Sequence, residues 1–135
     1  IPYELYEELI LHFSKKILNS VKEMNCPNIF FPKDFSLGLK SINNEICDFV
    51  SIDWHMSLNS ARYLVDKSVG VQGNMDPRIL YYNLNDIENY LKSCVDFGSK
   101  NSNWIFNLGH GFLPDIDYKK AQFVVDWIKK TNWNR

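Results

Sequence analysis

The sequence is short of cysteine, net charge and long apolar runs, and each shortage excludes a class of protein. Its 135 residues include three cysteines, Cys26, Cys47 and Cys94, and the formal net charge is −1. Three widely spaced cysteines indicate reduced thiols in an intracellular protein rather than a disulfide framework or a zinc cluster. The balanced charge gives no argument for a nucleic-acid partner or a membrane surface, and no apolar run reaches membrane-spanning length.

The composition is that of one folded domain. Hydrophobic residues make up 45% of the chain and aromatic residues 15%, so residues 1–135 can bury a sizeable core. No linker, repeat or low-complexity tract divides them. The chain starts with Ile1-Pro2-Tyr3, without an initiator Met and without the pattern of a signal peptide. We therefore expect it to be a piece of a longer polypeptide.

Hydrophobic periodicity predicts one leading helix and then four strand–helix pairs. The expected strands are residues 29–31, 49–53, 69–73 and 104–108, and the expected helices are 3–23, about 36–42, 57–65, 85–98 and 118–131. The core face of the first helix is expected to carry Leu5, Leu9, Phe13, Ile17 and Val21, with Tyr6, Ile10 and Leu18 widening it. Alternation with short links predicts right-handed βαβ units and a parallel sheet. Four such units favour half of a (β/α)₈ barrel, with an open doubly wound sheet as the competing architecture.

Helix caps are also predicted. Ser57, Asp76 and Asp117 each precede a helix at the N-cap spacing, and Asp34 or Ser36 is expected to cap the second helix. We expect Gly98 to end the fourth helix.

The stretch from Trp104 to Gly111 carries the strongest functional signal. Its apolar start predicts a strand buried on both faces, and His110 then stands between two glycines where that strand ends. The carboxyl ends of parallel strands are where such folds place their chemistry, although His110 could equally cap the following helix, with the two glycines serving only the turn. The other candidate cleft residues follow the same logic; they are Asp53, Trp54, Gln72, Asn74 and Asn107. For Trp54, core packing is an equal alternative.

Several motifs resemble one family. Gln72-Gly73-Asn74-Met75-Asp76-Pro77 and Asn107-Leu108-Gly109-His110-Gly111 are similar to motifs of uroporphyrinogen decarboxylase, as are Ile52-Asp53-Trp54 and, more loosely, residues 30–34. The resemblance covers nearly the whole chain in the right order. It implies a (β/α)₈ TIM barrel of which residues 1–135 are the carboxyl-terminal half. Ser51 departs from the family's usual glycine, and Tyr118 from its frequent proline.

The resemblance implies a carboxy-lyase of haem biosynthesis. That enzyme converts uroporphyrinogen III into coproporphyrinogen III by removing four carboxyl groups, with no metal or cofactor, in the cytoplasm or a plastid. Most of the family's catalytic residues lie in the other half of the barrel. Of its substrate-binding residues, only the one matching His110 is present here. The implied partners are the tetrapyrrole substrate, the missing amino-terminal half and a second copy in a homodimer, so the isolated chain is expected to be inactive.

Two alternatives belong to other classes. The superfamily also resembles cobamide-dependent (corrinoid) methyltransferases, which hold zinc with His and Cys at strand ends, but no cysteine falls at a strand end here. The chain could also be a non-catalytic half-barrel that only binds its missing half or another copy. The sequence predicts no substrate-binding role for its three arginines, Arg62, Arg78 and Arg135.

Overall fold

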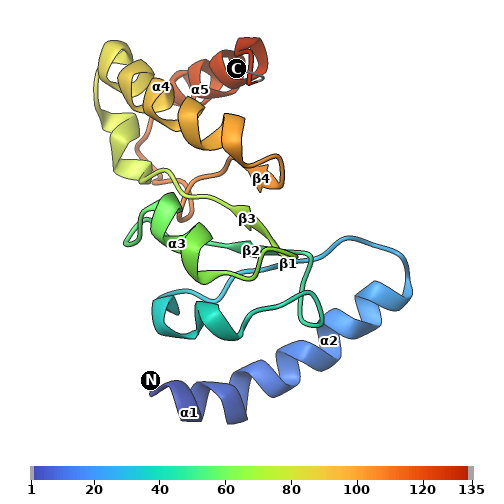
Figure 1. Cartoon of the computed structure of the whole chain (residues 1–135). Coiled ribbons are helices and arrows are strands. Elements are labelled where there is room, and N and C mark those ends of the chain that lie inside the picture. Colours follow the sequence, from blue (N-terminus) through green and yellow to red (C-terminus); the bar gives the residue numbers. More distant parts are fainter. Residues whose placement is uncertain (1, 134–135) are drawn as a thin grey trace.

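Four short parallel strands form the centre of the molecule. The structure is a computed structural model that describes residues 2–133, except for the side chain of Leu37. The strands are β1 (Ile29–Phe30), β2 (Phe49–Ser51), β3 (Gly70–Gln72) and β4 (Trp104–Ile105), and they lie side by side in that order (Figure 1). Each strand pairs in parallel with the one before it, as the alternation of strands and helices predicted.

Helices enclose this sheet on one side. They are α1 (Tyr3–Tyr6), η1 (Glu7–Leu11) and α2 (His12–Glu23), which form one continuous rod, then η2 (Ser36–Ser41), α3 (Leu58–Leu64), η3 (Pro77–Tyr81), α4 (Leu84–Lys100) and α5 (Tyr118–Lys130). Figure 1 shows the amino-terminal rod at the bottom, α3 in front of the strands, and α4 with α5 at the top. The caps predicted at Ser57, Asp76 and Asp117 are confirmed, because each side chain accepts a backbone N–H of the helix that follows.

The two faces of the sheet have different surroundings. Val50 and Val71 are paired neighbours on one face, and both are almost fully buried among residues of the helices, such as Ala61 and Leu39. Side chains alternate along a strand, so the next pair, Ser51 and Gln72, points to the opposite face. We call this opposite face the inner face. It carries no helix layer within the described chain.

The fourth strand differs from its prediction. It ends at Ile105 instead of Leu108, and the expected burial on both faces is wrong because the Ile105 side chain is 37% exposed. Leu108 keeps only an isolated bridge to Met75. The physical reason is position: Ile105 is paired with Gln72 and therefore points to the inner face, which no helix layer covers within residues 2–133.

Two helix predictions are also wrong. The second helix is a 3₁₀ turn whose N-cap position is Phe35, so neither Asp34 nor Ser36 caps it; Asp34 instead has a φ of 57°. Gly98 does not end α4, which runs on to Lys100. A Cβ at Gly98 would lie within 3 Å of the rings of Trp133 and Trp104, so this glycine serves close packing.

The amino-terminal rod is helical as predicted, but its predicted core face is not covered. Leu5, Leu9, Phe13 and Ile17 are 42% to 67% exposed, whereas Leu11 is almost fully buried. The rod packs on the rest of the chain through the side of this face that Tyr6 and Leu18 widen, together with Tyr3. The stripe of Leu5, Leu9, Phe13 and Ile17 is left uncovered within residues 2–133.

Candidate functional site

The carboxyl ends of the four strands gather most of the predicted site residues at one edge. The turn after β4 lies directly on the loop after β2. The N–H of Gly109 donates to the carbonyl oxygen of Met75 at 2.8 Å, and a Cβ at Gly109 would lie 2.5 Å from the backbone nitrogen of Trp54. Only glycine allows this approach, which carries His110 to the side of Trp54.

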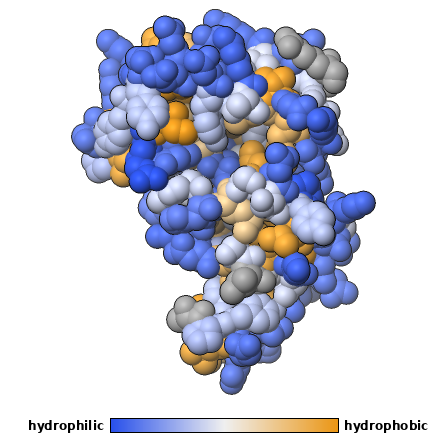
Figure 2. All heavy atoms as spheres, turned by 60° about the vertical axis from the view of Figure 1, so that its left-hand side comes forward, coloured by the Kyte–Doolittle hydropathy of each residue, from blue (hydrophilic) through white to orange (hydrophobic). Residues whose placement is uncertain are grey.

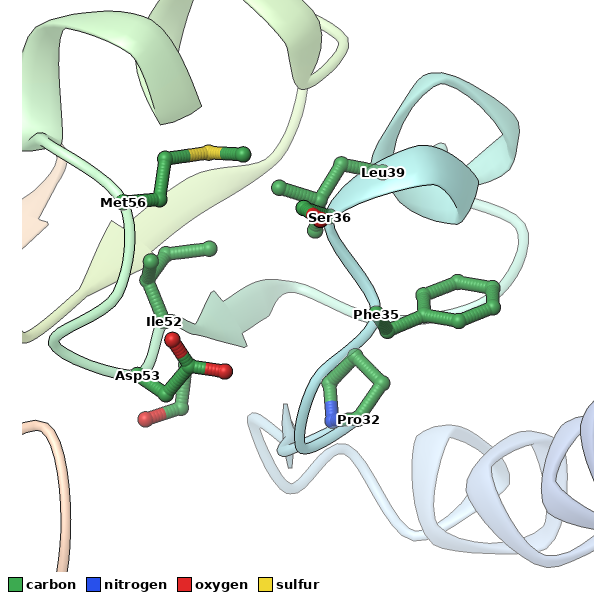
Figure 3. A pocket seen from close by; sticks show the side chains of 8 residues that line it. Pro32, Phe35, Ser36, Leu39, Ile52, Asp53 and Met56 are labelled. Atoms are coloured by element: carbon green, nitrogen blue, oxygen red, sulfur yellow. The ribbon is translucent and has the colours of Figure 1, made fainter. Parts of the chain in front are cut away.

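Asp53 is a structural anchor of this edge. Its carboxylate accepts the backbone N–H groups of Asp34 and His55, both at 2.9 Å, and its side chain is only 10% exposed. Figure 3 shows this carboxylate directed towards the loop that begins at Pro32. The buried carboxylate of Asp53 therefore ties the loop after β1 to the loop after β2. The sequence predicted Asp53 as a cleft residue and did not predict this link between loops.

Asp34, Asp53 and His55 form a group with the geometry to hold a metal ion. Their ligand atoms all lie within 4.8 Å of one another, and His55 Nδ1 is 3.2 Å from Asp53 and 3.5 Å from Asp34. The backbone hydrogen bonds to Asp53 already account for this clustering without an ion. The group therefore holds the loop after β1 against the loop after β2.

A small cavity lies beside Asp53. It has a volume of about 10 Å³, and Figure 3 shows the side chains of Leu39, Ile52 and Met56 facing it. Such a volume holds about one water molecule. It is therefore too small to receive a tetrapyrrole and is best described as a packing gap between η2 and β2.

Gln72 and Asn74 occupy different positions, although both follow β3 in the sequence. Gln72 lies on the inner face, where its Nε2 donates to Ser51 Oγ at 3.3 Å. Asn74 is buried, and its Nδ2 donates to the carbonyl oxygens of Asp53, at 2.8 Å, and Met56. Gln72 therefore lies on the open face of the sheet, whereas the side-chain amide of Asn74 holds the loop after β2.

Trp54 connects His110 to the other loops. Its ring lies edge-on to the His110 ring at 5.4 Å between centroids and tilted against the His55 ring at 4.7 Å. His110 itself is exposed. Asn107 is exposed as well, and its side-chain oxygen accepts the backbone N–H of Leu108, a local turn contact. The edge thus presents His110 and Trp54 together.

A wider hollow opens between α3 and α4 at the same end of the sheet. Its volume is about 420 Å³, and its lining includes Trp54, His55, Asp76 and Tyr90. Burial raises the pKa of Tyr90 well above its usual value and also raises that of Cys94, which lines the hollow too. Both groups therefore stay protonated and neutral at physiological pH, and the hollow offers them as hydrogen-bonding groups without charge.

The arginines have distinct places. The Arg62 guanidinium donates to the carbonyl oxygens of Val69 at 2.7 Å and Val65 at 2.8 Å, which makes it a structural clamp after α3. Arg78, for which the sequence predicted no role, pairs with Asp76 two positions earlier at a helix start, with Nη2 2.6 Å from Asp76 Oδ2. Arg135 lies outside the described residues.

The fold and the site together define a class. Strands that follow one another in a parallel sheet, with helices between them and polar groups at their carboxyl ends, are the units of a (β/α)₈ barrel. Residues 1–131 match the model of the family described as Uroporphyrinogen decarboxylase (URO-D). The chain belongs to that family, as its motifs predicted, and its four units correspond to half of the family's TIM barrel.

Similar curated proteins carry the same name. The chain is 35% identical to "Uroporphyrinogen decarboxylase" of Francisella philomiragia subsp. philomiragia over 133 residues, which is 96% of this chain and 39% of that protein. It is 33% identical to the protein of that name from Geobacter metallireducens, over 93% of this chain and 37% of that protein. The chain therefore spans about two fifths of the length of the curated relatives it matches.

One further observation concerns the helices. None of those in residues 2–133 combines the length and the apolar character that crossing a membrane requires.

Proposed function

We propose that residues 1–135 are the carboxyl-terminal half of a uroporphyrinogen decarboxylase. The parent enzyme removes four acetate carboxyl groups of uroporphyrinogen III as carbon dioxide and gives coproporphyrinogen III. The observation that carries the proposal is the position of His110 on its glycine turn beside Trp54, within a chain that belongs to the family along nearly its whole length.

In this proposal His110 binds and orients the substrate. Its imidazole is exposed at the carboxyl edge, where a substrate carboxylate can accept a hydrogen bond from a ring N–H. Gln72 offers a neutral amide on the inner face, and Asp53 fixes the loops that carry Trp54 and His55. These residues position the ring system, and the proton transfers to the pyrrole carbon belong to groups outside this chain.

The charges at this edge explain why another half is needed. The three carboxylates of Asp34, Asp53 and Asp76 lie there, and among the described arginines and lysines Arg78 forms an ion pair with one of them, Asp76. A substrate with eight carboxylates is repelled by such an edge and needs additional cations. We propose that the amino-terminal half supplies them, without any metal or cofactor.

Uncovered apolar surfaces support the same partner. On the β1 side, Ile29 and Phe31 are 45% and 44% exposed, and the stripe of the amino-terminal rod that includes Phe13 and Ile17 is exposed as well. On the β4 side, an apolar groove of about 340 Å³ runs between the strand end and α5, with Phe106, Leu108 and Val125 in its lining. Figure 2 shows apolar residues reaching the surface between polar ones, including at the lower end, where the rod lies. In our proposal the other barrel half covers these surfaces, and the closed barrel forms a homodimer.

The test is the full-length parent protein assayed with uroporphyrinogen III. We expect stepwise decarboxylation to coproporphyrinogen III without added metal. Chromatography of the oxidised products measures each step. His110→Asn should lower turnover efficiency about tenfold to a hundredfold, the size of one lost charge-assisted hydrogen bond. It should also make partly decarboxylated porphyrins accumulate, because the four arms meet His110 in different orientations. Equal rates and product profiles for both proteins would remove His110 from the site.

The two alternatives have weaker support. A corrinoid methyltransferase would need a zinc-bound cysteine at a strand end. Cys47 and Cys94 are instead buried in the core, and Cys26 precedes β1 at its amino end. The uncovered surfaces also fit a purely structural half-barrel. The assay of the full-length parent separates this reading from the enzyme, because a parent without decarboxylase activity would leave only the structural role.

A further inference from the structure

Arg78 occupies a position at the carboxyl edge that the proposed function leaves unused. Its Nε donates to both carboxylate oxygens of Asp76, at 3.0 and 2.9 Å, and its Nη2 donates to Asp76 Oδ2 at 2.6 Å. This pairing uses one edge of the planar guanidinium. No hydrogen bond from Nη1 to any residue within 2–133 occupies the other edge, and the side chain is 64% exposed.

The Trp54 ring contacts the same guanidinium. The central carbon of the Arg78 guanidinium lies 5.5 Å from the centroid of the Trp54 ring, a cation–π distance, and the His110 ring lies 5.4 Å from that centroid. Arg78 comes from the segment after β3, Trp54 from the loop after β2 and His110 from the turn after β4. Three loops therefore bring two basic side chains to one indole.

This arrangement fixes a side chain that is usually mobile. A free arginine samples many rotamers, and ordering it costs conformational entropy. Asp76 and Trp54 impose that order before any ligand arrives, so a ligand that binds the free edge meets a fork already in place. A carboxylate is the group that matches this planar pair of N–H donors.

We propose that Arg78 is a second carboxylate-binding residue of the cleft rim, which receives one carboxylate arm of the same tetrapyrrole whose other arm meets His110. The inference rests on the proposed function, because that function supplies a ligand with several carboxylates spread around one ring. Asp76 and Trp54 are the positioning residues for Arg78. The cation also offsets part of the negative charge at this edge.

The test uses the full-length parent protein with Arg78→Gln, Arg78→Lys and Lys92→Gln. Lys92 is a matched control because it is exposed and paired with Glu88 at 2.9 Å on α4. With uroporphyrinogen III at low salt, Arg78→Gln should raise KM about tenfold, as expected for one lost charge-assisted hydrogen bond, while kcat stays close to the wild-type value. Arg78→Lys should give a smaller increase, because lysine keeps the charge but not the planar fork. The effect should shrink as ionic strength rises.

The outcomes separate this inference from the proposed function. An unchanged KM in Arg78→Gln, or a change equal to that of Lys92→Gln, would overturn the role of Arg78 while the wild-type protein still decarboxylates its substrate. A lower melting temperature with an unchanged KM would make the Asp76–Arg78–Trp54 contacts structural only, and would also overturn it. A wild-type parent that binds and decarboxylates no porphyrinogen would refute the proposed function, and this inference with it.

Discussion

Gly109→Ala is the substitution that tests how the site is built. Gly109 is buried where the turn after β4 crosses the loop after β2. The new Cβ would lie 2.5 Å from the backbone nitrogen of Trp54 and 3.0 Å from the backbone oxygen of Asn74. Both neighbours are main-chain atoms, so no change of rotamer relieves the clash, and the turn has to move away from Trp54.

Gly111→Ala is the matched control, two residues further along the same motif. A Cβ at Gly111 has no atom within 4 Å, and its backbone does not need a positive φ. Replacing glycine by alanine lowers the entropy of the unfolded chain by a similar amount at both positions, a gain of about 0.4–1 kcal/mol. The difference between the two variants therefore isolates the steric cost, about 1–3 kcal/mol for overpacking a tight site.

The assay compares the free energies of unfolding of the two variants in the full-length protein by urea denaturation. The comparison requires that both variants have the same dependence of the unfolding free energy on urea concentration. We expect Gly109→Ala to be less stable than Gly111→Ala by that 1–3 kcal/mol. Decarboxylation should fall in Gly109→Ala, because His110 moves with the turn, and stay near wild type in Gly111→Ala. Equal stability and equal activity of the two variants would refute the close contact between this turn and the loop after β2.

Two further predictions concern the thiols and the isolated chain. Burial raises the pKa of Cys47 to about 11, so its thiol stays protonated far above physiological pH, and Cys94 is shifted in the same direction. Alkylation at pH 8, mapped by mass spectrometry, should therefore label exposed Cys26 quickly and fully buried Cys47 only on unfolding; rapid labelling of Cys47 in the native protein would contradict its place in the core. Residues 1–135 produced alone should self-associate, because the sheet edges and the outer stripe of the amino-terminal rod are uncovered; light scattering that finds a monodisperse monomer at high concentration would count against the half-barrel.

Local sequence signals predicted much of this fold. The caps at Ser57 and Asp117 depend on a side chain and an N–H two or three residues away, so a short stretch of sequence contains all the necessary information. The order of the strands and their parallel pairing follow from alternation with short links. The motif around His110 likewise predicted the family, which residues 1–131 confirm.

Contacts between distant segments decided the rest. The sequence shows that Asp53 and Asn74 are polar. Only the folded chain shows that Asp53 ties two loops together and that the side-chain amide of Asn74 donates to backbone carbonyl oxygens. The pairing of Arg78 with Asp76 was within reach of the sequence, whereas its position over Trp54 depends on how two loops meet.

Burial showed the same division between local and distant information. The apolar stripe of the amino-terminal rod and the apolar run of β4 predicted a helix and a strand, and both exist. Periodicity does not reveal which apolar face has a partner, because burial depends on what lies opposite in space. Leu11 is buried and Phe13 is 57% exposed on the same helix. The sequence by itself determined the elements and their order, and the tertiary structure decided which of their faces are covered and which remain exposed within residues 2–133.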